Sequence, residues 1–579
     1  MYQILQKIPF LFELFFNGTF ILFYSMRTMN RVPANWSIEL IDNGLKFGAK
    51  VVPFIILMSM IVNFISGKGI EDFLRKHVFS ILVFVPLMIT WGDLEFAFGL
   101  CSAHLIASVL SLYDDDKGGT IDLIEEKVIR SSSEILGVKL KPAQLVLLSF
   151  AAVIFIGAFL LKLPVSSATG KSIDFIDALF MATSATCVTG LGSISLASDL
   201  SLFGQIVILI LIQIGGLSIM TLYSSMTILL GKSMRMKDRI IMQDLLDVSS
   251  LEELFRMIID IITYTLMIEL WGAIVLTIAF TFEGFEFSKA IYFGFYHSIS
   301  AFCNAGFALF DNSLESYATS PLIHGTIAIL ITLGGLGFIT LKELKEVIVK
   351  KKSIVRLGVH SKVVLVTSFF LTMSGFVIIF FGEFLNALDN YTLWEKIQIS
   401  MFQSVTLRTA GFNTIPMTSL NNYTIFAMIL YMFIGGSPGS TAGGIKTSTL
   451  AILVQSIRST LSGHKDVTVF DRKIPSQIVV RSIALTFISV FIASFFVFLM
   501  MKLEPEQGFL PLVFEVFSAS GTVGLSLGIT GYLSFMGKLA ISVLMLIGRI
   551  GPLTLILAIG EKSAGQSKAD YPHGRIMIG

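Results

Sequence analysis

Four short glycine-centred stretches recur along the chain at nearly constant spacing, and this repeat restricts the possible folds more than any other feature. In each stretch a bulky apolar residue follows the glycine, and the four read TCVTGL (186–191), FCNAGF (302–307), LRTAGF (407–412) and SGTVGL (520–525). Successive glycines are 116, 105 and 113 residues apart. Self-similarity at a regular period indicates an array of similar structural units, so we expect four of them.

A second set of glycine motifs follows the first on the same period. Each member keeps its first glycine and ends in threonine: IGGLSIMT (214–221), LGGLGFIT (333–340), IGGSPGST (434–441) and IGRIGPLT (547–554). Two registered motifs per unit are harder to obtain by chance than one. Both motifs therefore define the unit.

The composition indicates a polytopic membrane protein. Hydrophobic residues make up 54% of the 579 residues, and charged residues make up only 14%, against about 25% in a typical soluble domain. The net charge of +2 argues against a nucleic acid partner. The first apolar run, near 9–25, contains Glu13 and Asn17 and lacks a small-residue cleavage site after it. We therefore expect a retained helix there and no cleavable signal peptide.

Each unit has the same order of apolar segments. A full-length span comes first, near 142–164, 254–280, 362–385 and 478–502. A shorter segment leads into the first glycine motif, at 172–186, 287–302, 394–408 and 509–521. A second span follows, near 202–230, 322–349, 423–457 and 533–560. Because about 20 residues cross the hydrocarbon and about 10–15 suit a re-entrant helix, we predict an all-α fold of four helix–pore helix–filter loop–helix repeats.

This plan divides the chain into six parts. The first, 1–140, is an N-terminal extension with about three or four membrane segments, near 9–26, 47–66, 78–92 and 95–113. The others are pore repeats 1 to 4 and a cytoplasmic tail, at 141–231, 253–349, 362–459, 475–562 and 563–579.

The distribution of Lys and Arg predicts the orientation of the units. The connectors between units are basic, whereas the loops just after the glycine motifs contain no Lys or Arg: 191–203, 307–323, 412–422 and 525–536. Basic loops face the cytoplasm. All four units then run in the same direction, and we predict parallel repeats in a pseudo-fourfold arrangement around a central pore.

The loops after the short segments have the chemistry of a cation filter. Extended backbone at membrane depth is tolerated only where it lines water or is buried in protein, and rings of carbonyl oxygens can replace the hydration shell of a cation. Glycine tolerates the positive φ and close approach that such a ring needs, and pore-helix C-termini add partial negative charge. A single such glycine more often packs helices. Four in register favour a filter of Val188, Thr189, Gly190, Asn304, Ala305, Gly306, Thr409, Ala410, Gly411, Thr522, Val523 and Gly524.

These motifs resemble those of a known family. The four loops VTGL, NAGF, TAGF and TVGL, together with SPGSTAGGIKT, IGRIGPLT and the terminal YPHGRIMIG, are similar to the ion-conducting membrane subunit of the Trk/Ktr/HKT potassium transporters, and most to the bacterial Ktr type. The resemblance covers about residues 140–579. Residues 1–140 depart from the short Ktr N-terminus.

The resemblance implies a function and partners. It implies potassium uptake across the plasma membrane (the bacterial inner membrane), a homodimer with one pore per subunit, and a separate cytosolic nucleotide-binding regulatory ring. It implies no cofactor in this chain and no metal beyond the transported monovalent cation, with sodium as a possible activator. In this family a Ser at the first filter position accompanies sodium transport, so Gly190 favours potassium. A sodium-selective or sodium/potassium cotransporting member is the alternative.

The stretch FIGGSPGSTAGGIKT (433–447) interrupts the second span of repeat 3 with glycine and proline, the poorest helix formers. A loop at that depth would lie across the inner half of the pore, and the resemblance likewise implies an intramembrane gate loop. Arg549 stands where the other repeats have glycine, and we expect it to donate hydrogen bonds to this loop; a snorkelling interfacial arginine is the alternative. Lys446 is either a loop anchor or a surface charge. The predicted gate residues are Gly435, Gly436, Ser437, Gly439, Ser440, Thr441, Gly443, Gly444, Lys446 and Arg549.

The remaining polar residues give little sign of other chemistry. Ile445 separates Gly444 from Lys446, so GSTAGGIKT lacks the spacing of a phosphate-binding loop. Cys101, Cys187 and Cys303 show no disulfide framework or metal-ligand spacing. We expect Glu269 to pair with a neighbouring repeat rather than with the ion, and His297 and Gln213 to be packing hydrogen-bonders.

Three other classes of membrane protein fit less well. A proton-coupled secondary transporter would show inverted repeats and buried carboxylate relays. A voltage-gated channel would need an arginine-rich sensor helix. An intramembrane enzyme would need clustered His, Asp, Glu or Cys, and we predict that the chain is not an enzyme.

Overall fold

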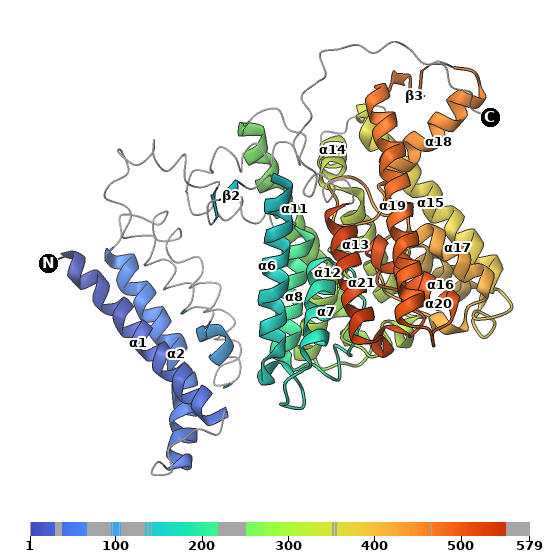
Figure 1. Cartoon of the computed structure of the whole chain (residues 1–579). Helices are drawn as coiled ribbons and strands as arrows, with labels where there is room; N and C mark the ends of the chain where they lie inside the picture. The colour runs from blue at the N-terminus through green and yellow to red at the C-terminus, as the bar shows by residue number, and fades with distance from the viewer. Residues whose placement is uncertain are drawn as a thin grey trace.

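The computed structural model shows a helical bundle with a helix pair at one side (Figure 1). The structure describes residues 2–28, 37–66, 94, 97–102, 105, 134–135, 138–139, 142–217, 251–349, 353, 356–464 and 466–551. Four predictions fall wholly or partly outside these residues: the membrane segment at 78–92 with most of that at 95–113, the second span of repeat 1 after 217, the second span of repeat 4 after 551, and the tail at 563–579.

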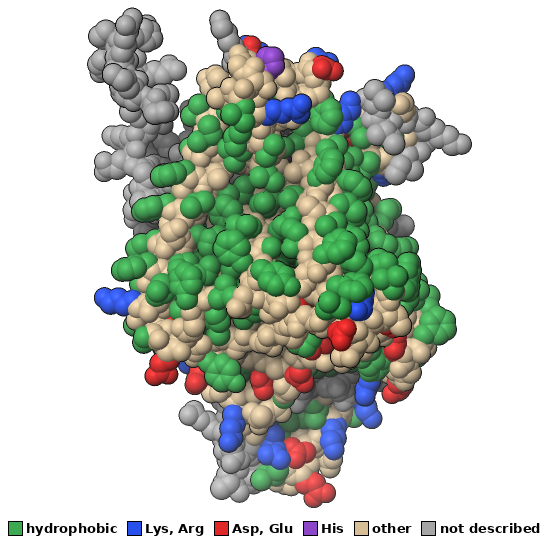
Figure 2. Space-filling view, turned by 90° about the vertical axis from the view of Figure 1, so that its right-hand side faces the viewer, with side chains coloured by type: hydrophobic (Ala, Val, Ile, Leu, Met, Phe, Trp, Pro, Cys, Tyr) green, Lys and Arg blue, Asp and Glu red, His purple; other side chains and the backbone are tan. Residues whose placement is uncertain are grey.

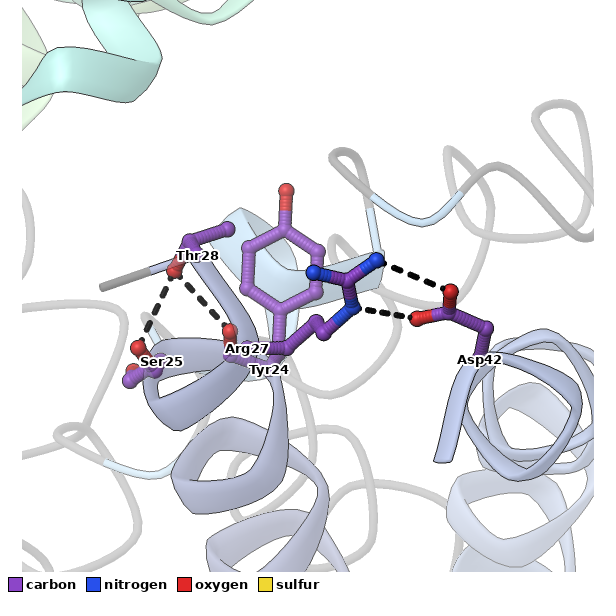
Figure 3. A network of polar contacts seen from close by, with 5 residues as sticks. All are labelled: Tyr24, Ser25, Arg27, Thr28 and Asp42. Atoms are coloured by element: carbon purple, nitrogen blue, oxygen red, sulfur yellow. Dashed lines mark hydrogen bonds and ion pairs between the residues drawn. The ribbon is translucent and has the colours of Figure 1, made fainter. Parts of the chain in front are cut away.

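The N-terminal pair consists of α1 (Tyr2–Thr28) and α2 (Ile38–Ser66). A small core that includes Tyr24, Val52 and Cys101 holds it together. Arg27 on α1 also donates two hydrogen bonds to the carboxylate of Asp42 on α2, at 2.7 and 3.0 Å (Figure 3). The predicted segments at 9–26 and 47–66 are therefore helical.

Each of the four units begins with a long helix and continues with a short one. The long helices are α6 (Pro142–Lys162), α11 (Leu251–Phe282), α15 (Val359–Glu383) and α19 (Ser476–Leu503). The short ones are α7 (Phe175–Thr186), α12 (Phe287–Phe302), α16 (Leu393–Thr406) and α20 (Phe509–Gly521). Their bounds agree with the predicted segments to within a few residues.

The second span of each unit breaks or ends at the second glycine motif. The helices before this point are α8 (Leu202–Gly216), α13 (Pro321–Leu336), α17 (Asn422–Met432) and α21 (Phe535–Ile550). After the break α14 (Phe338–Val349) and α18 (Thr447–Leu461) continue units 2 and 3.

The prediction of one continuous helix over 322–349 is wrong. The α13 and α14 axes are bent by 105° at Gly337, whose φ of +84° leaves the helical region. A Cβ at Gly337 would lie 2.5 Å from the Ser437 Oγ atom, so the close approach of the loop from unit 3 also requires glycine here. Gly551, at the same place in unit 4, has a φ of +89°.

The elements outside the bundle helices are short. Strands β1 (Glu134–Ile135) and β2 (Val138–Lys139) form one antiparallel pair, and β3 (Thr468–Val469) and β4 (Arg472–Lys473) form another. One-turn 3₁₀ helices lie in the connections, at η1 (Pro164–Ser166), η2 (Glu315–Tyr317), η4 (Met417–Ser419) and η5 (Thr530–Tyr532).

Four hydrophobic cores join the units in a ring, in which each unit packs against the next and unit 4 packs against unit 1. Each core contains an aromatic residue of one short helix, at most 2% exposed, packed among residues of the preceding unit. Tyr296 of unit 2 lies in the core of unit 1, Phe402 in that of unit 2, and Phe514 in that of unit 3. Phe180 of unit 1 closes the order, because it packs in the core of unit 4.

The outer surface of the bundle suits a lipid environment. Figure 2 shows a broad band of hydrophobic side chains with charged side chains gathered above and below it. Among the described residues, three helices are long and apolar enough to cross a membrane, Ile259–Phe282, Val359–Glu383 and Ser476–Leu503, and the bent pair of α13 and α14 would be a fourth. Exposed Phe369, Phe381 and Phe487 on two of them are typical of lipid-facing surfaces.

Candidate functional site: the four loops and the loop of unit 3

The four glycine-centred loops have the same unusual backbone. In each, the residue two positions before the glycine has a positive φ: Val188 (56°), Asn304 (58°), Thr409 (69°) and Thr522 (52°). The glycine itself also has a positive φ, between 71° and 93°. The sign of φ therefore alternates along each triplet. Such alternation gathers successive peptide groups onto one side of the chain, unlike the alternation of sides in a strand.

The loops approach one another in the same cyclic order as the cores. A Cβ added at Gly190 would lie 2.5 Å from the carbonyl oxygen of Ala305, the middle residue of the next loop. The same holds at each of the other glycines, with 2.7 Å from Gly306 to Ala410, 2.4 Å from Gly411 to Val523, and 2.1 Å from Gly524 to Thr189. All twelve residues of the predicted filter are thus brought together. A side chain at any of the four glycines would displace a carbonyl oxygen.

Most amide groups of these loops donate hydrogen bonds to the short helix of their own unit. Thr189 N–H donates to the Ser184 carbonyl at 2.8 Å, and Val523 N–H donates to that of Ser518 at 2.8 Å. The hydroxyls of the same two serines accept from Gly190 and Gly524, each at 3.1 Å. Within the described part of the chain, no carbonyl of the twelve residues accepts a hydrogen bond. The loops therefore have free carbonyl oxygens, and nine of their twelve amides donate to the short helix of their own unit, a combination suited to a cation.

Beyond the loops, neighbouring units are tied by polar contacts. Leu314 N–H donates to the Asn413 carbonyl at 3.0 Å, and the Asn413 amide donates to the Glu315 carboxylate at 2.7 Å. Burial raises the pKa of Glu315, and the hydrogen bond from Asn413 partly offsets that rise. Ser195 of unit 1 donates to Asp311 of unit 2. These contacts lie in the loops predicted to face outward.

The loop between α17 and α18 is held by unit 2. Ser437 N–H donates to the Gly335 carbonyl at 3.0 Å, and Thr441 N–H donates to that of Gly334 at 3.3 Å. The Thr441 hydroxyl donates to the Phe302 carbonyl, at the end of the short helix of unit 2, at 3.2 Å. On the other side of the loop, a Cβ at Gly443 would lie 2.1 Å from the Thr522 Oγ1 atom. The loop thus lies directly against the fourth glycine-centred loop.

The two basic residues predicted for this region both bind its carbonyls. The Arg549 guanidinium donates from Nη1 to the Thr441 carbonyl and from Nη2 to the Gly215 carbonyl at the end of α8. Lys446 Nζ donates to the Ala442 carbonyl at 2.7 Å. Arg549 therefore makes the hydrogen bond to the loop that its position predicted, and it connects units 1, 3 and 4. Its role in gating stays a prediction.

The other intramembrane polar residues make structural contacts. Glu269 is 5% exposed and accepts from Gln213 of unit 1 at 3.2 Å, so it pairs with a neighbouring repeat as expected. His297 contacts two backbone groups, the Phe293 carbonyl at 2.7 Å and the Leu309 amide at 3.2 Å. Cys101, Cys187 and Cys303 are free and buried. Among the described residues, no group of His, Cys, Asp or Glu could hold a metal ion.

Two of the buried charged residues that the sequence analysis missed lie next to the glycine-centred loops. Arg408 directly precedes the third triplet and donates to the Ser368 carbonyl at 3.2 Å and the Thr372 hydroxyl at 3.1 Å. Glu515 lies behind the fourth loop and accepts from Ser526 at 2.8 Å and Thr530 at 2.5 Å. Arg408 stands where units 1 and 2 have cysteine; this departure from the repeat was the available signal.

Known proteins are similar to this chain over most of its length. The sequence profile of the TrkH family, described as a cation transport protein, matches residues 141–566. The chain belongs to the TrkH cation transport family. It is therefore a multi-pass membrane transporter rather than an enzyme.

Individual relatives in this family match most of their own length. The Ktr system potassium uptake protein B of Bacillus subtilis is 36% identical over 453 residues, which are 78% of this chain and 100% of that protein. The potassium/sodium uptake protein NtpJ of Enterococcus hirae is 35% identical over 447 residues, 76% of this chain and 98% of that protein. The family match begins at residue 141, so it leaves the N-terminal extension unmatched.

A solved structure has a similar fold. The potassium transporter TrkH from Vibrio parahaemolyticus superposes with a TM-score of 0.58 at 17% identity, over 88% of this chain and 98% of that chain. This coverage is more than the residues from 141 onward could supply alone. Part of the N-terminal extension therefore shares the fold of that transporter.

Proposed function

We propose that this chain takes up potassium across the plasma membrane through a central pore, around which its four units are arranged with pseudo-fourfold symmetry. The observation that carries the proposal is the ring of four middle-residue carbonyls, Thr189, Ala305, Ala410 and Val523, each nearest to the glycine of an adjoining loop. Rings of carbonyl oxygens replace the hydration shell of potassium in selective filters. Relatives named as potassium uptake proteins support the choice of ion.

The filter works through the backbone rather than through fixed carboxylates. Amides anchored to the short helices keep the carbonyls free, and glycine at 190, 306, 411 and 524 prevents a side chain from entering the ring. The C-terminal ends of the four short helices add partial negative charge next to the ion. Gly190 favours potassium over sodium at the first loop.

The loop at 433–446 and Arg549 form the gate of this pore. The loop contacts the fourth filter loop through Gly443, and Arg549 holds the Thr441 carbonyl. A guanidinium below a cation filter also raises the electrostatic barrier to a second cation. Breaking the hydrogen bond between Arg549 and Thr441 would let the loop leave the pore and would remove the electrostatic barrier to a cation.

The working assembly is a homodimer with one pore per subunit and a separate cytosolic nucleotide-binding ring. The Ktr system names of the relatives support a multi-component system. The basic connectors between units face the cytoplasm by the Lys and Arg rule, where such a ring would dock.

Complementation tests the function directly. A bacterium that lacks potassium uptake should grow at low potassium when it expresses this chain, and growth with and without added sodium shows whether sodium activates transport. Purified protein in liposomes should conduct potassium without any chemical turnover. Absence of flux from folded protein, with and without a regulatory ring, would contradict the proposal.

Sodium transport is the second candidate. The Enterococcus hirae relative is named for both potassium and sodium. Parallel measurement of potassium and sodium flux in the same liposomes decides between a selective potassium pathway and a shared one.

A further inference from the structure

A cavity lies between units 3 and 4, behind the loop that we assign as the gate. Its volume is about 240 Å³, and its walls come from the end of the loop, from one face of α19 and from the end of α21. This is below the ~300–1,000 Å³ usual for drug-sized ligands. The space therefore suits a small headgroup better than a whole organic ligand.

The α19 wall changes from charged to apolar along its length. Arg481, Leu485, Ser489 and Ile492 line the cavity and recur at helical spacing, so they lie on one face of the helix. From Arg481 to Ile492 this face extends about 16 Å at 1.5 Å per residue. Arg481 lies near the helix end that follows the basic β3–β4 segment, which is predicted to be cytoplasmic.

The charges around the cavity favour an anion. Arg481 and Lys446 both line it, and none of its described lining residues is acidic. In the described part of the chain, the Arg481 guanidinium has no hydrogen-bond or ion-pair partner. Lys446 donates to the Ala442 carbonyl, which leaves donors of its ammonium group for a second acceptor.

The surroundings of the cavity are typical of a lipid-binding site. Helices α18 and α19, which both contribute to the lining, also carry exposed apolar side chains outside it: Val454 and Ile457 on α18, and Ile483 and Phe487 on the far face of α19, between 49% and 73% exposed. Figure 2 shows basic residues at the edges of the hydrophobic band. Basic pockets between membrane helices on the cytoplasmic side are typical sites for acidic lipid headgroups.

We propose that this cavity binds the phosphate headgroup of an acidic phospholipid, with its acyl chains along the exposed faces of α18 and α19. The phosphate lies between Arg481 and Lys446, and the glycerol backbone lies toward Ser489. Because Gly444, Ile445 and Lys446 also line the cavity, an occupied site restrains the C-terminal end of the loop. That restraint matters for transport only if the loop is the gate, whereas the binding itself does not depend on the proposed function.

The experiment measures lipid binding on the full chain. Protein is reconstituted into bilayers of phosphatidylcholine with or without phosphatidylglycerol, extracted into mild detergent and weighed by native mass spectrometry. The wild type should retain phosphatidylglycerol in preference to phosphatidylcholine. Arg481→Gln should lower the apparent affinity for phosphatidylglycerol about fivefold, the effect of one basic residue near a lipid surface.

Two further variants separate this site from general surface charge. Ser489→Phe fills the apolar end and should reduce retention while all charges remain; its hydroxyl donates only to the Leu485 carbonyl of the same helix, so no distant partner is orphaned. Arg458→Gln removes an exposed arginine of α18 that does not line the cavity, and retention should not change. Thermal unfolding of each variant confirms that it is folded.

Three results would overturn the proposal. Equal retention in the wild type, Arg481→Gln and Ser489→Phe would show that the cavity holds no lipid. An equal loss in Arg458→Gln would show that only surface charge matters. Displacement of bound phosphatidylglycerol by inorganic phosphate at low concentration would show that a free anion, rather than a lipid, is the natural occupant.

Discussion

At the scale of single residues, three of the four glycine-centred loops contain a backbone conformation that a side chain opposes. Val188, Thr409 and Thr522 are β-branched residues with positive φ, which is a rare combination and costs about 1–3 kcal/mol per residue. Strain of this kind persists only where the surroundings over-determine it. Here the anchored amides and the neighbouring loops supply that constraint, and the result is a set of carbonyls fixed in place.

Replacing Gly190 with serine should raise sodium permeation relative to potassium, by about tenfold. The new Cβ would lie 2.5 Å from the Ala305 oxygen, so the carbonyl ring must distort, and ~1.4 kcal/mol of lost discrimination corresponds to a factor of ten. Potassium and sodium fluxes in liposomes measure the ratio. Gly528→Ser is the matched control, because Gly528 has a φ of +88° but nothing within 4 Å of its Cβ position. Equal ion preference in both variants would argue against the filter assignment.

Replacing Arg549 with alanine should increase potassium flux in liposomes that lack the regulatory ring. Each hydrogen bond from a charged donor contributes ~1.5–3 kcal/mol, so loss of the contacts to Thr441 and Gly215 should raise the flux at least tenfold. Arg549→Lys should give an intermediate flux, since one ammonium cannot reproduce the two-pronged geometry of the guanidinium. Folded protein with unchanged or lower flux would contradict a closing role.

The predicted site residues belong to repeated sequence motifs, whereas the missed ones are defined by contacts with residues elsewhere in the chain. The four glycines and Arg549 stand in registered motifs, so the repeat itself revealed them. Arg408 and Glu515 depend on partners far along the chain, Thr372 and Thr530 among them, and no local pattern encodes such a contact. The positive φ of Val188 could not be predicted from residue propensity either, because β-branched residues ordinarily favour extended backbone.

At the scale of elements, the break in the second span is more general than the sequence indicated. Glycine and proline density revealed the break in unit 3, where Met432 ends α17. LGGLGFIT in unit 2 has the glycine content of a helix-packing motif, so its bend at Gly337 could not be inferred locally. The bend depends on the unit 3 loop, because the Phe338 amide donates to the Gly439 carbonyl at 3.1 Å. The two breaks are therefore parts of one contact.

Deleting 436–444 should open the pore and raise potassium flux. The deletion joins Gly435 to Ile445, and these residues are already adjacent, with the Gly435 amide donating to the Ile445 carbonyl at 2.8 Å. Helices α17 and α18 can therefore stay in place. Flux in liposomes measures the effect, and thermal unfolding checks the fold. A folded deletion variant without flux would show that the loop is needed for conduction and is not a gate.

At the scale of the whole molecule, the interface between units 1 and 4 differs from the other three. Consecutive units are joined by the chain, whereas the first and last units meet only through side chains and backbone contacts. The core around Phe180 and the ion pair of Lys538 with Asp177, at 2.6 Å, hold this interface. The approach of Gly524 to Thr189 depends on the same closure, so the proposed filter is complete only if the ends of the array meet.

Lys538→Met should therefore destabilise the protein markedly. The two side chains of the pair are only 11% and 14% exposed, and removing one partner leaves a largely buried carboxylate unpaired, at a cost of about 2–4 kcal/mol. Lys473→Met breaks a pair whose side chains are 65% and 50% exposed, and it should cost at most ~1 kcal/mol. The measurement is the apparent Tm of both variants in detergent, together with the ratio of potassium to sodium flux. If Lys538→Met lowers the Tm no more than Lys473→Met and leaves the flux ratio unchanged, the ion pair does not close the array. A lower Tm with a reduced ratio would mean that closure of the array and ion selection depend on the same interface.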